Sequence, residues 1–432
     1  MTLPVVALLG TCDTKLQELL YLRTRLLFTK CIVILIDTGR TPSSDPAINI
    51  SQPELLSRHA PSSLQLSPND VGSLSRGDLI KHLAACATAC VRELYAAGKI
   101  HGIISIGGSG GTSLASAVMR DALPMGFPKL IVSTMASGDV RPFVGEIDLT
   151  MMYSVVDIAG SNTILDSILA NAAGAMGGMA YAYKARMRDA EERSERDVAG
   201  SKKKRIAITM FGVTTPCVDY IRRHLDAHGN YEIYVFHATG AGGRAMERLI
   251  SERRIDAVLD VTTTEIADEV VGGVLSAGPD RLNAAGKARI PQIVVLGALD
   301  MVNFGPRDTV PEKFRERNLY EHNPSVTLLR TNEDECERIG EFIATKLKTG
   351  LGPNTTEIWV PEGGMSMLST RTGAFYHPEA DEALVKALVE GLRDTGIAIQ
   401  RDKRDINDEG FATDLAERII ALTDSKPIDT NN

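Results

Sequence analysis

The chain has 432 residues and a formal net charge of -8 at pH 7, with 44% hydrophobic and 24% charged residues. This length predicts two or three domains with a sizeable core and excludes a small disulfide-stapled protein. Because the basic residues are scattered in a mildly acidic chain, we expect neither nucleic acid nor an anionic membrane as a partner. The first residues have no signal-peptide pattern and no window reaches about 18 uninterrupted apolar residues, so we expect a cytoplasmic protein.

In the first half of the chain, short β-branched runs alternate with segments of helical period, which is typical of βαβ units in a buried parallel sheet. The predicted strands are Val5–Gly10, Ile32–Asp37, Gly102–Ile106 and Leu130–Thr134. Between the second and third of them, residues 40–77 are rich in Ser, Pro and Asn. Their length favours an active-site flap, with a plain surface excursion as the alternative.

From Lys184 to Arg205 the sequence is charged and almost without large apolar residues, and we expect a linker there. The strand pattern then begins again, with runs at Ile206–Met210, Ile233–His237, Ala257–Val261, Ile293–Leu296, Glu357–Val360 and Ile397–Gln400. The sequence therefore predicts an α/β fold of two Rossmann-like lobes, whose parallel sheets face a central cleft. The expected boundaries are residues 1–185, a linker at 186–204, and residues 205–425.

The segment Ile104-Ser-Ile-Gly-Gly-Ser-Gly-Gly-Thr-Ser is the strongest chemical signal. A glycine-rich turn between a buried strand and a helix exposes backbone N–H groups at the positive end of the helix dipole, which suits an anion. The spacing fits neither the Walker A pattern nor the dinucleotide fingerprint. Close packing of helix and strand is the alternative reason for these glycines.

Other polar residues follow predicted strands and are expected near the same ligand. Asp13, Thr14 and Lys15 follow the first strand, where Asp13 or Thr14 is equally suited to cap a helix. Ser137 and Gly138 follow the fourth strand. In the second lobe, the run that begins Thr239-Gly-Ala-Gly-Gly-Arg244 has two readings, a second anion contact or an ordinary loop.

Three residues of the second lobe are candidates for acid–base roles: Asp300, His377 and Asp405. Asp300 and Asn303 could also hold Mg²⁺ or a ribose hydroxyl through oxygen atoms. Helix capping, turn formation and plain exposure are the competing explanations. No spacing identifies a metal-ligand set.

Taken in order, several stretches resemble the family of the N-terminal ATP-binding domain of the plant tomato mosaic virus resistance protein, with its bacterial and fungal relatives. The stretches that carry this resemblance are Ile106-Gly-Gly-Ser-Gly-Gly-Thr-Ser-Leu, Ser133-Thr-Met-Ala-Ser-Gly, Ser154-Val-Val-Asp-Ile, Gly297-Ala-Leu-Asp-Met-Val-Asn-Phe-Gly and Asp405-Ile-Asn-Asp-Glu-Gly-Phe-Ala. The resemblance implies ATP binding, two Rossmann-like lobes and a homodimer. The antiviral action of the plant protein is not carried over, because no residue here identifies its surface.

We therefore expect a cytosolic ATP-binding protein, with Mg²⁺ as a candidate companion of the nucleotide. The expected ligand residues are Thr11, Asp13, Thr14, Lys15, Gly107, Gly108, Ser109, Gly110, Gly111, Thr112, Ser137 and Gly138. The alternative is an enzyme, ATP-dependent or of hydrolase or lyase type, that acts on a small phosphorylated or carboxylated metabolite in the cleft between the lobes. The small-residue helix Asn171–Ala180 could contribute to the homodimer contact, although internal packing is the commoner use of such a face.

Overall fold

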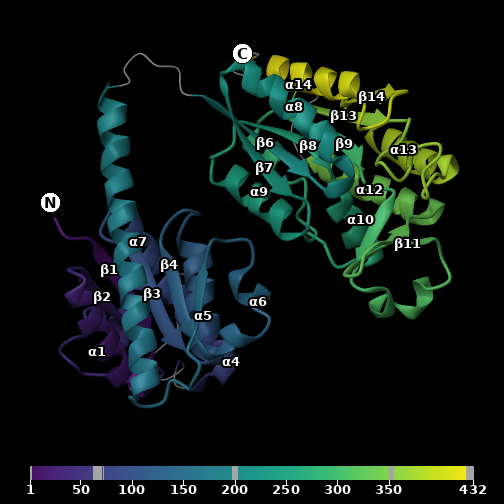
Figure 1. Ribbon diagram of the computed structural model, residues 1–432. Helices are drawn as coiled ribbons and strands as arrows, with labels where there is room; N and C mark the ends of the chain where they lie inside the picture. The colour runs from purple at the N-terminus through teal and green to yellow at the C-terminus, as the bar shows by residue number, and fades with distance from the viewer. Residues whose placement is uncertain (1, 62–70, 72, 197–202, 350–354, 425–432) are drawn as a thin grey trace. The chain divides into compact units, whose positions relative to one another are not determined.

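The computed structural model describes residues 2–61, 71, 73–196, 203–349 and 355–424. The chain divides into two compact units, Met1–Gly200 and Ser201–Asn432 (Figure 1). Each unit is built around a parallel β-sheet, as the alternation of strands and helices along the sequence predicts, and each is described here by itself.

The first unit contains a five-stranded parallel sheet in the order β2-β1-β3-β4-β5. Strands β1, β3 and β4 are almost entirely buried, because near-continuous apolar runs such as GIISIG can be covered on both faces. The five strands are β1 (Val5–Gly10), β2 (Ile32–Asp37), β3 (Gly102–Gly107), β4 (Lys129–Ser133) and β5 (Thr150–Tyr153).

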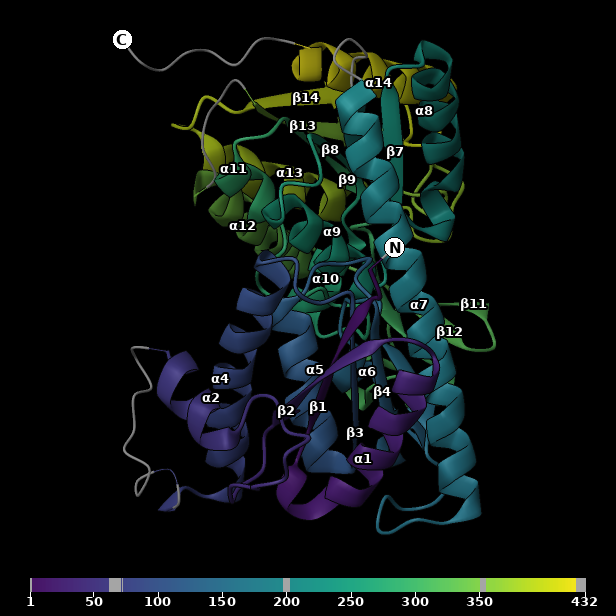
Figure 2. The same cartoon turned by 90° about the vertical axis from the view of Figure 1, so that its left-hand side faces the viewer.

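Helices cover both faces of this sheet (Figures 1 and 2). Apolar side chains of α1 and α7 pack on one face, and those of α4 and α5 pack on the other. The helical elements of the unit are α1 (Cys12–Phe28), α2 (Gln52–His59), α4 (Arg76–Ala96), α5 (Ser109–Ala122), η2 (Thr134–Ser137), α6 (Arg141–Val144) and α7 (Thr163–Arg196).

The small-residue face of α7 serves internal packing. Ala172, Ala173, Met176 and Ala180 are buried in the core between α7 and the sheet. A methyl group placed at Gly102 would lie 2.6 Å from the Met176 sulfur, so the helix approaches β3 closely. The expectation that this face contributes to a homodimer contact is wrong for these four side chains, because they already lie against the chain's own sheet.

The second unit repeats the architecture with a six-stranded parallel sheet in the order β14-β13-β9-β8-β6-β7. Its strands are β6 (Lys204–Met210), β7 (Tyr231–His237), β8 (Ala257–Thr262), β9 (Gln292–Gly297), β13 (Thr356–Pro361) and β14 (Ala398–Asp402). A small antiparallel sheet, in the order β10-β12-β11, adds β10 (Met301–Phe304), β11 (Leu319–Asn323) and β12 (Val326–Arg330).

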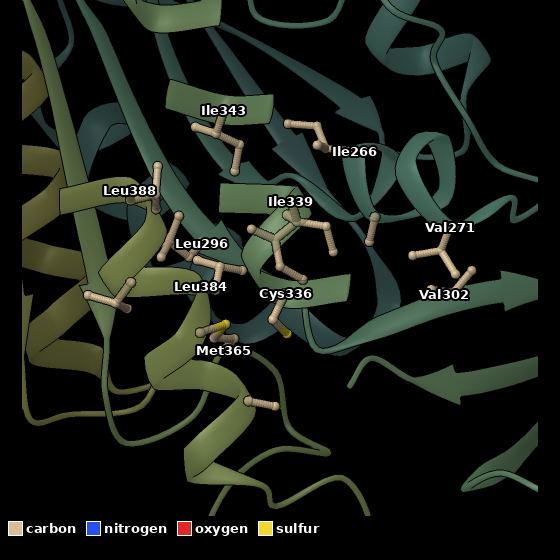
Figure 3. Packing of buried hydrophobic residues seen from close by; sticks show 14 of the residues in the cluster. Ile266, Val271, Leu296, Val302, Cys336, Ile339, Ile343, Met365, Leu384 and Leu388 are labelled. Atoms are coloured by element: carbon tan, nitrogen blue, oxygen red, sulfur yellow. The ribbon is translucent and has the colours of Figure 1, made fainter. Parts of the chain in front are cut away.

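One core of the second unit lies between its sheet and helices α10, α12 and α13, where Ile339, Leu384 and Leu296 meet (Figure 3). Helices α8 and α14 cover the other face. The helical elements are η3 (Gly212–Thr214), α8 (Thr215–His228), α9 (Ala241–Ser251), α10 (Thr264–Val271), α11 (Ala284–Ala288), η4 (Arg307–Thr309), η5 (Glu312–Phe314), α12 (Glu333–Thr349), α13 (Pro378–Leu392) and α14 (Glu409–Asp424).

The ten predicted strands are present, but the structure differs from the sequence analysis in three places. Strand β5 and the antiparallel sheet were not predicted. Strands β5 and β11 are largely exposed and have no strong apolar pattern, and β10 and β12 are buried but only four and five residues long. Helix α7 continues to Arg196, into the range 186–204 expected as a linker, since Ala, Arg, Glu and Met are strong helix formers. The rest of that range up to residue 202 lies outside the described residues. Over the part of the chain described, no helix is long and apolar enough to cross a membrane.

Candidate functional site

The strand order of the first sheet reverses between β1 and β3. Strand β2 follows β1 on one side, whereas β3 pairs with β1 on the other side. The loops after β1 and β3 therefore leave the carboxyl edge of the sheet in opposite directions, and this switch point is where open α/β sheets bind ligands. These two loops, Thr11–Lys15 and Gly107–Thr112, carry most of the ligand residues that the sequence predicts.

The glycine loop after β3 brings strand and helix into close contact. A methyl group placed at Gly107 would lie 3.0 Å from Gly111 Cα, so only glycine fits there without a shift. Gly108 is the N-cap of α5 and offers no side chain to the helix. Among the described residues, no acceptor is present for the backbone N–H groups of Ser109, Gly110 and Gly111. These donors remain available at the positive end of a 14-residue helix.

Thr112 has a structural role instead of a free hydroxyl. It is fully buried, and its Oγ1 lies 2.6 Å from Ser133 Oγ at the end of β4. The Ser133 hydroxyl in turn accepts the Met135 N–H at 2.9 Å. This chain of hydrogen bonds fixes the start of α5 against η2, and Ser137 and Gly138 close the same turn at its far end.

A cation lies beside the glycine loop. A methyl group placed at Gly110 would meet Arg76 Nη2 at 3.4 Å and Ile80 Cδ1 at 3.3 Å. Arg76 is exposed and begins α4, at the end of the range 40–77 whose role was left open between a flap and a surface excursion. That range is anchored at this edge, since the backbone N–H groups of Arg40 and Thr41 donate to Asp13 Oδ2 at 2.8 and 3.2 Å. Sequence reasoning missed Arg76, which no motif marks.

The loop after β1 is held by two carboxylates. Asp37, buried at the end of β2, accepts the backbone N–H groups of Cys12 and Gly39 at 3.0 and 2.8 Å. Asp13 Oδ2 accepts the N–H groups of Arg40 and Thr41. The other oxygen, Asp13 Oδ1, is buried without a partner among the described residues. Asp37 was not a sequence candidate, although its place at a strand end is a detectable signal.

The remaining residues of this loop are already engaged. The Lys15 ammonium donates to the Ile158 carbonyl, which turns it away from the role of a free phosphate ligand. The hydroxyls of Thr11 and Thr14 share a hydrogen bond of 2.9 Å. The structure thus brings the β1, β3 and β4 loops to one edge of the sheet. Among the described residues, the backbone N–H groups at the start of α5 and the Arg76 guanidinium at this edge have no hydrogen-bond acceptor.

In the second glycine-rich loop, Thr239–Arg244, two backbone N–H groups donate to a carboxylate of the chain itself. The N–H groups of Gly240 and Gly243 donate to Glu265 Oε1 at 2.6 and 3.0 Å, and Arg244 donates to the Ser276 carbonyl at 3.0 Å. A side chain at Gly243 would collide with the Glu265 carboxylate. The idea of a second contact to a ligand anion at these glycines is therefore not supported, because a buried glutamate occupies the donors.

Arg281 connects this glutamate to two further carboxylates. Its guanidinium donates to Asp260 at 2.6 and 2.7 Å, to Glu265 at 2.9 Å and to Glu247 at 3.3 Å. Although burial alone lowers the pKa of Arg281, the three carboxylates raise it well above its usual value. The cluster is closed from solvent and holds α9, β8 and α10 together.

The three acid–base candidates have separate local partners. Burial raises the pKa of Asp300 to about 6, and its Oδ2 accepts the Ser366 hydroxyl at 2.7 Å while Oδ1 has no partner among the described residues. His377 caps α13, accepting the Ala380 N–H on Nδ1 at 3.0 Å. Asp405 accepts the Asn407 N–H at 2.8 Å. No hydrogen bond or ion pair among the described residues joins these three side chains to one another.

The described residues contain no group of three or more His, Cys, Asp or Glu side chains that could hold a metal ion. The Asn303 NH2 group donates to Asp268 Oδ1 at 3.0 Å and to the Thr264 hydroxyl at 3.2 Å, whereas the Oδ1 atoms of Asp300 and Asn303 are buried without a partner among the described residues. The pairing of Asp300 and Asn303 around Mg²⁺ or a ribose hydroxyl stays a prediction.

The fold and this edge of the first sheet define a two-unit α/β protein with a topological switch point in the sheet of its N-terminal unit. The chain belongs to Uncharacterised protein family UPF0261: the N-terminal domain of that family matches residues 4–185 and the C-terminal domain matches residues 203–423.

Relatives cover nearly the whole chain. A UPF0261 protein of Clostridium tetani is 44% identical over 417 residues, which is 96% of this chain and 98% of that protein. The tomato ToMV resistance protein Tm-1(GCR237) is 37% identical over 437 residues, covering 97% of this chain and 56% of the plant protein. Among solved structures, MurG of Acinetobacter baumannii matches 96% of this chain and 99% of its own, with 10% identity and a TM-score of 0.22.

Proposed function

We propose that the chain binds ATP in its N-terminal unit, with the triphosphate at the glycine loop Gly107–Thr112. The observation that supports this most directly is the start of α5, where three successive backbone N–H groups lack an acceptor among the described residues at the switch point of the sheet. Free N–H groups at a helix start favour a phosphate through both hydrogen bonds and the helix dipole.

Arg76 supplies the positive charge in this proposal. Its guanidinium lies next to Gly110, and a planar guanidinium can donate two parallel hydrogen bonds to a phosphate. This replaces the role that the sequence suggested for Lys15, whose ammonium is engaged by Ile158. Thr11, Thr14, Ser137 and Gly138 border the ligand from the neighbouring loops.

Asp13 fits the Mg²⁺ that accompanies ATP. Its Oδ1 is buried and without a partner among the described residues, and Mg²⁺ is commonly held by one or two carboxylates together with phosphate oxygens. Asp13 Oδ2 stays committed to the Arg40 and Thr41 N–H groups, so the carboxylate is held in place while Oδ1 is available.

Calorimetric titration of ATP into Gly110→Val tests the proposal. The new side chain would displace Arg76 and crowd the N–H groups, removing two or three charge-assisted hydrogen bonds of roughly 1.5–3 kcal/mol each. We expect ATP affinity to fall about a hundredfold or more while the thermal melt stays cooperative.

Gly178→Val is the matched control, because a methyl group placed at Gly178 on α7 meets no atom within 4 Å. It should leave ATP affinity unchanged. Unchanged affinity in a folded Gly110→Val protein would contradict the proposed site. The second glycine loop would not then be the next candidate, since the Glu265 carboxylate already occupies the N–H groups of Gly240 and Gly243.

A further inference from the structure

The edge of the first sheet next to the glycine loop carries exposed apolar side chains. Tyr153 is 42% exposed, Met135 38% and Val155 57%, although large apolar side chains in this unit are mostly buried. Tyr153 ends β5, Met135 lies in η2 after β4, and Val155 follows β5. Contacts of η2 with both α5 and β5 make the surface continuous with the glycine loop.

The sheet register places Tyr153 on the same face as the glycine loop. Gly107 is in register with Ser133, and Ser133 with Tyr153. Ile103, Ile131 and Met151 lie an even number of residues before these three positions and belong to or pack against the core on the α5 side. Because side chains alternate along a strand, Gly107, Ser133 and Tyr153 form a row on that side, about 10 Å long from end to end.

Backbone strain accompanies this surface. The Val156 N–H donates to the Ser154 carbonyl at 2.7 Å, which closes a three-residue turn around Val155 with a φ of +63°. A β-branched residue rarely adopts this conformation, and turns of this kind are strained. Such strain is concentrated at ligand sites, where the surrounding structure holds it. The buried Ser154 hydroxyl bonds the Val156 carbonyl at 2.7 Å and stabilises the turn.

We propose that Tyr153 and Met135 form the platform on which the heteroaromatic base of the nucleotide stacks, while its phosphates occupy the start of α5. This inference rests on the proposed ATP site and adds the subsite that distinguishes a nucleotide from a bare phosphate. A flat base matches an exposed tyrosine ring and a polarisable methionine side chain, and the row of three strands separates this platform from the phosphate donors.

The experiment compares two probes, ATP and inorganic tripolyphosphate, by calorimetric titration with Mg²⁺ present. Base stacking on an aromatic ring predicts that Tyr153→Ala lowers ATP affinity by about tenfold to a hundredfold. Tripolyphosphate affinity should stay unchanged, and Tyr153→Phe should bind ATP like the unmodified protein. Tyr181→Ala is the matched control, since Tyr181 is also 42% exposed but contacts the Lys30 carbonyl before β2, at the opposite end of the strands.

The outcomes separate the platform from the phosphate site. If both probes bind and Tyr153→Ala changes neither affinity, the platform is refuted and the phosphate site stands. If Tyr153→Ala weakens both probes equally, the residue acts through the fold, and the platform is likewise refuted. A lower molar mass of Tyr153→Ala in light scattering would assign the surface to a second copy of the chain. If neither probe binds the unmodified protein, the proposed function fails together with the platform.

Discussion

Asp268 is buried in the second unit, and this burial disfavours the ionised form of its carboxyl group. Burial raises its pKa to about 7, although the Asn303 backbone N–H, the Asn303 amide and the Leu275 N–H all donate to it. In the unfolded chain an aspartate has a pKa of about 3.9. Between pH 4 and 7 the folded state therefore binds more protons than the unfolded state, and this group makes the folded protein less stable as the pH rises through that window.

We expect urea denaturation to show a smaller free energy of unfolding at pH 7.5 than at pH 5, and a weaker dependence on pH in Asp268→Asn. Asp308→Asn, at an exposed position of η4, serves as the control and should keep the original dependence. An identical pH dependence in Asp268→Asn and in the unmodified protein would show that the carboxyl is ionised on both sides of the window.

At the scale of elements, Arg281 holds α9, β8 and α10 together through Glu247, Asp260 and Glu265. Removing the guanidinium leaves three carboxylates without their shared counter-charge in a closed interior. We expect Arg281→Met to lower the free energy of unfolding in urea by about 3–5 kcal/mol, as for other broken buried ion pairs. Arg393→Met, which removes an exposed pair with Glu390, should change it by less than about 1 kcal/mol. Equal effects of the two variants would contradict a buried cluster.

At the scale of the whole molecule, the two units share one strand order. When the strands of each parallel sheet are numbered separately along the chain, both sheets follow 2-1-3-4-5, with a sixth strand added in the second. The units meet in the chain at Gly200 and Ser201, close to the basic residues Lys202 and Lys203. Because domain boundaries are the segments that few contacts cross, we expect limited trypsin digestion to cut first near these lysines and to release two stable fragments. A first cut within Gly102–Gly138 would contradict this division.

The homodimer implied by the family resemblance stays a prediction, and light scattering decides it.

Local sequence pattern was sufficient to predict the class of fold, the ten main strands and the glycine loop. Runs such as Val5–Gly10 and Gly102–Gly107 are apolar at nearly every position and end at a glycine, so the sequence itself shows both the buried strand and the turn that follows. Weak patterns failed: β5 has four residues with little burial, and the helix-forming residues at the end of α7 were taken for a linker because they are charged.

The sequence by itself determined where strands, helices and glycine turns occur, because these follow from residue period and backbone freedom over a few neighbouring positions. Only the tertiary structure decided which polar groups share a site. Pairing of Val6 with Gly102 creates the switch point, and the intervening chain brings Arg76 to Gly110. Glu265 accepts the N–H groups of Gly240 and Gly243 in one glycine loop, while those of Ser109, Gly110 and Gly111 in the other have no acceptor in the part of the chain described. This difference depends on contacts between residues more than twenty positions apart. Such contacts leave no periodic trace in the sequence, since they arise from how whole elements pack.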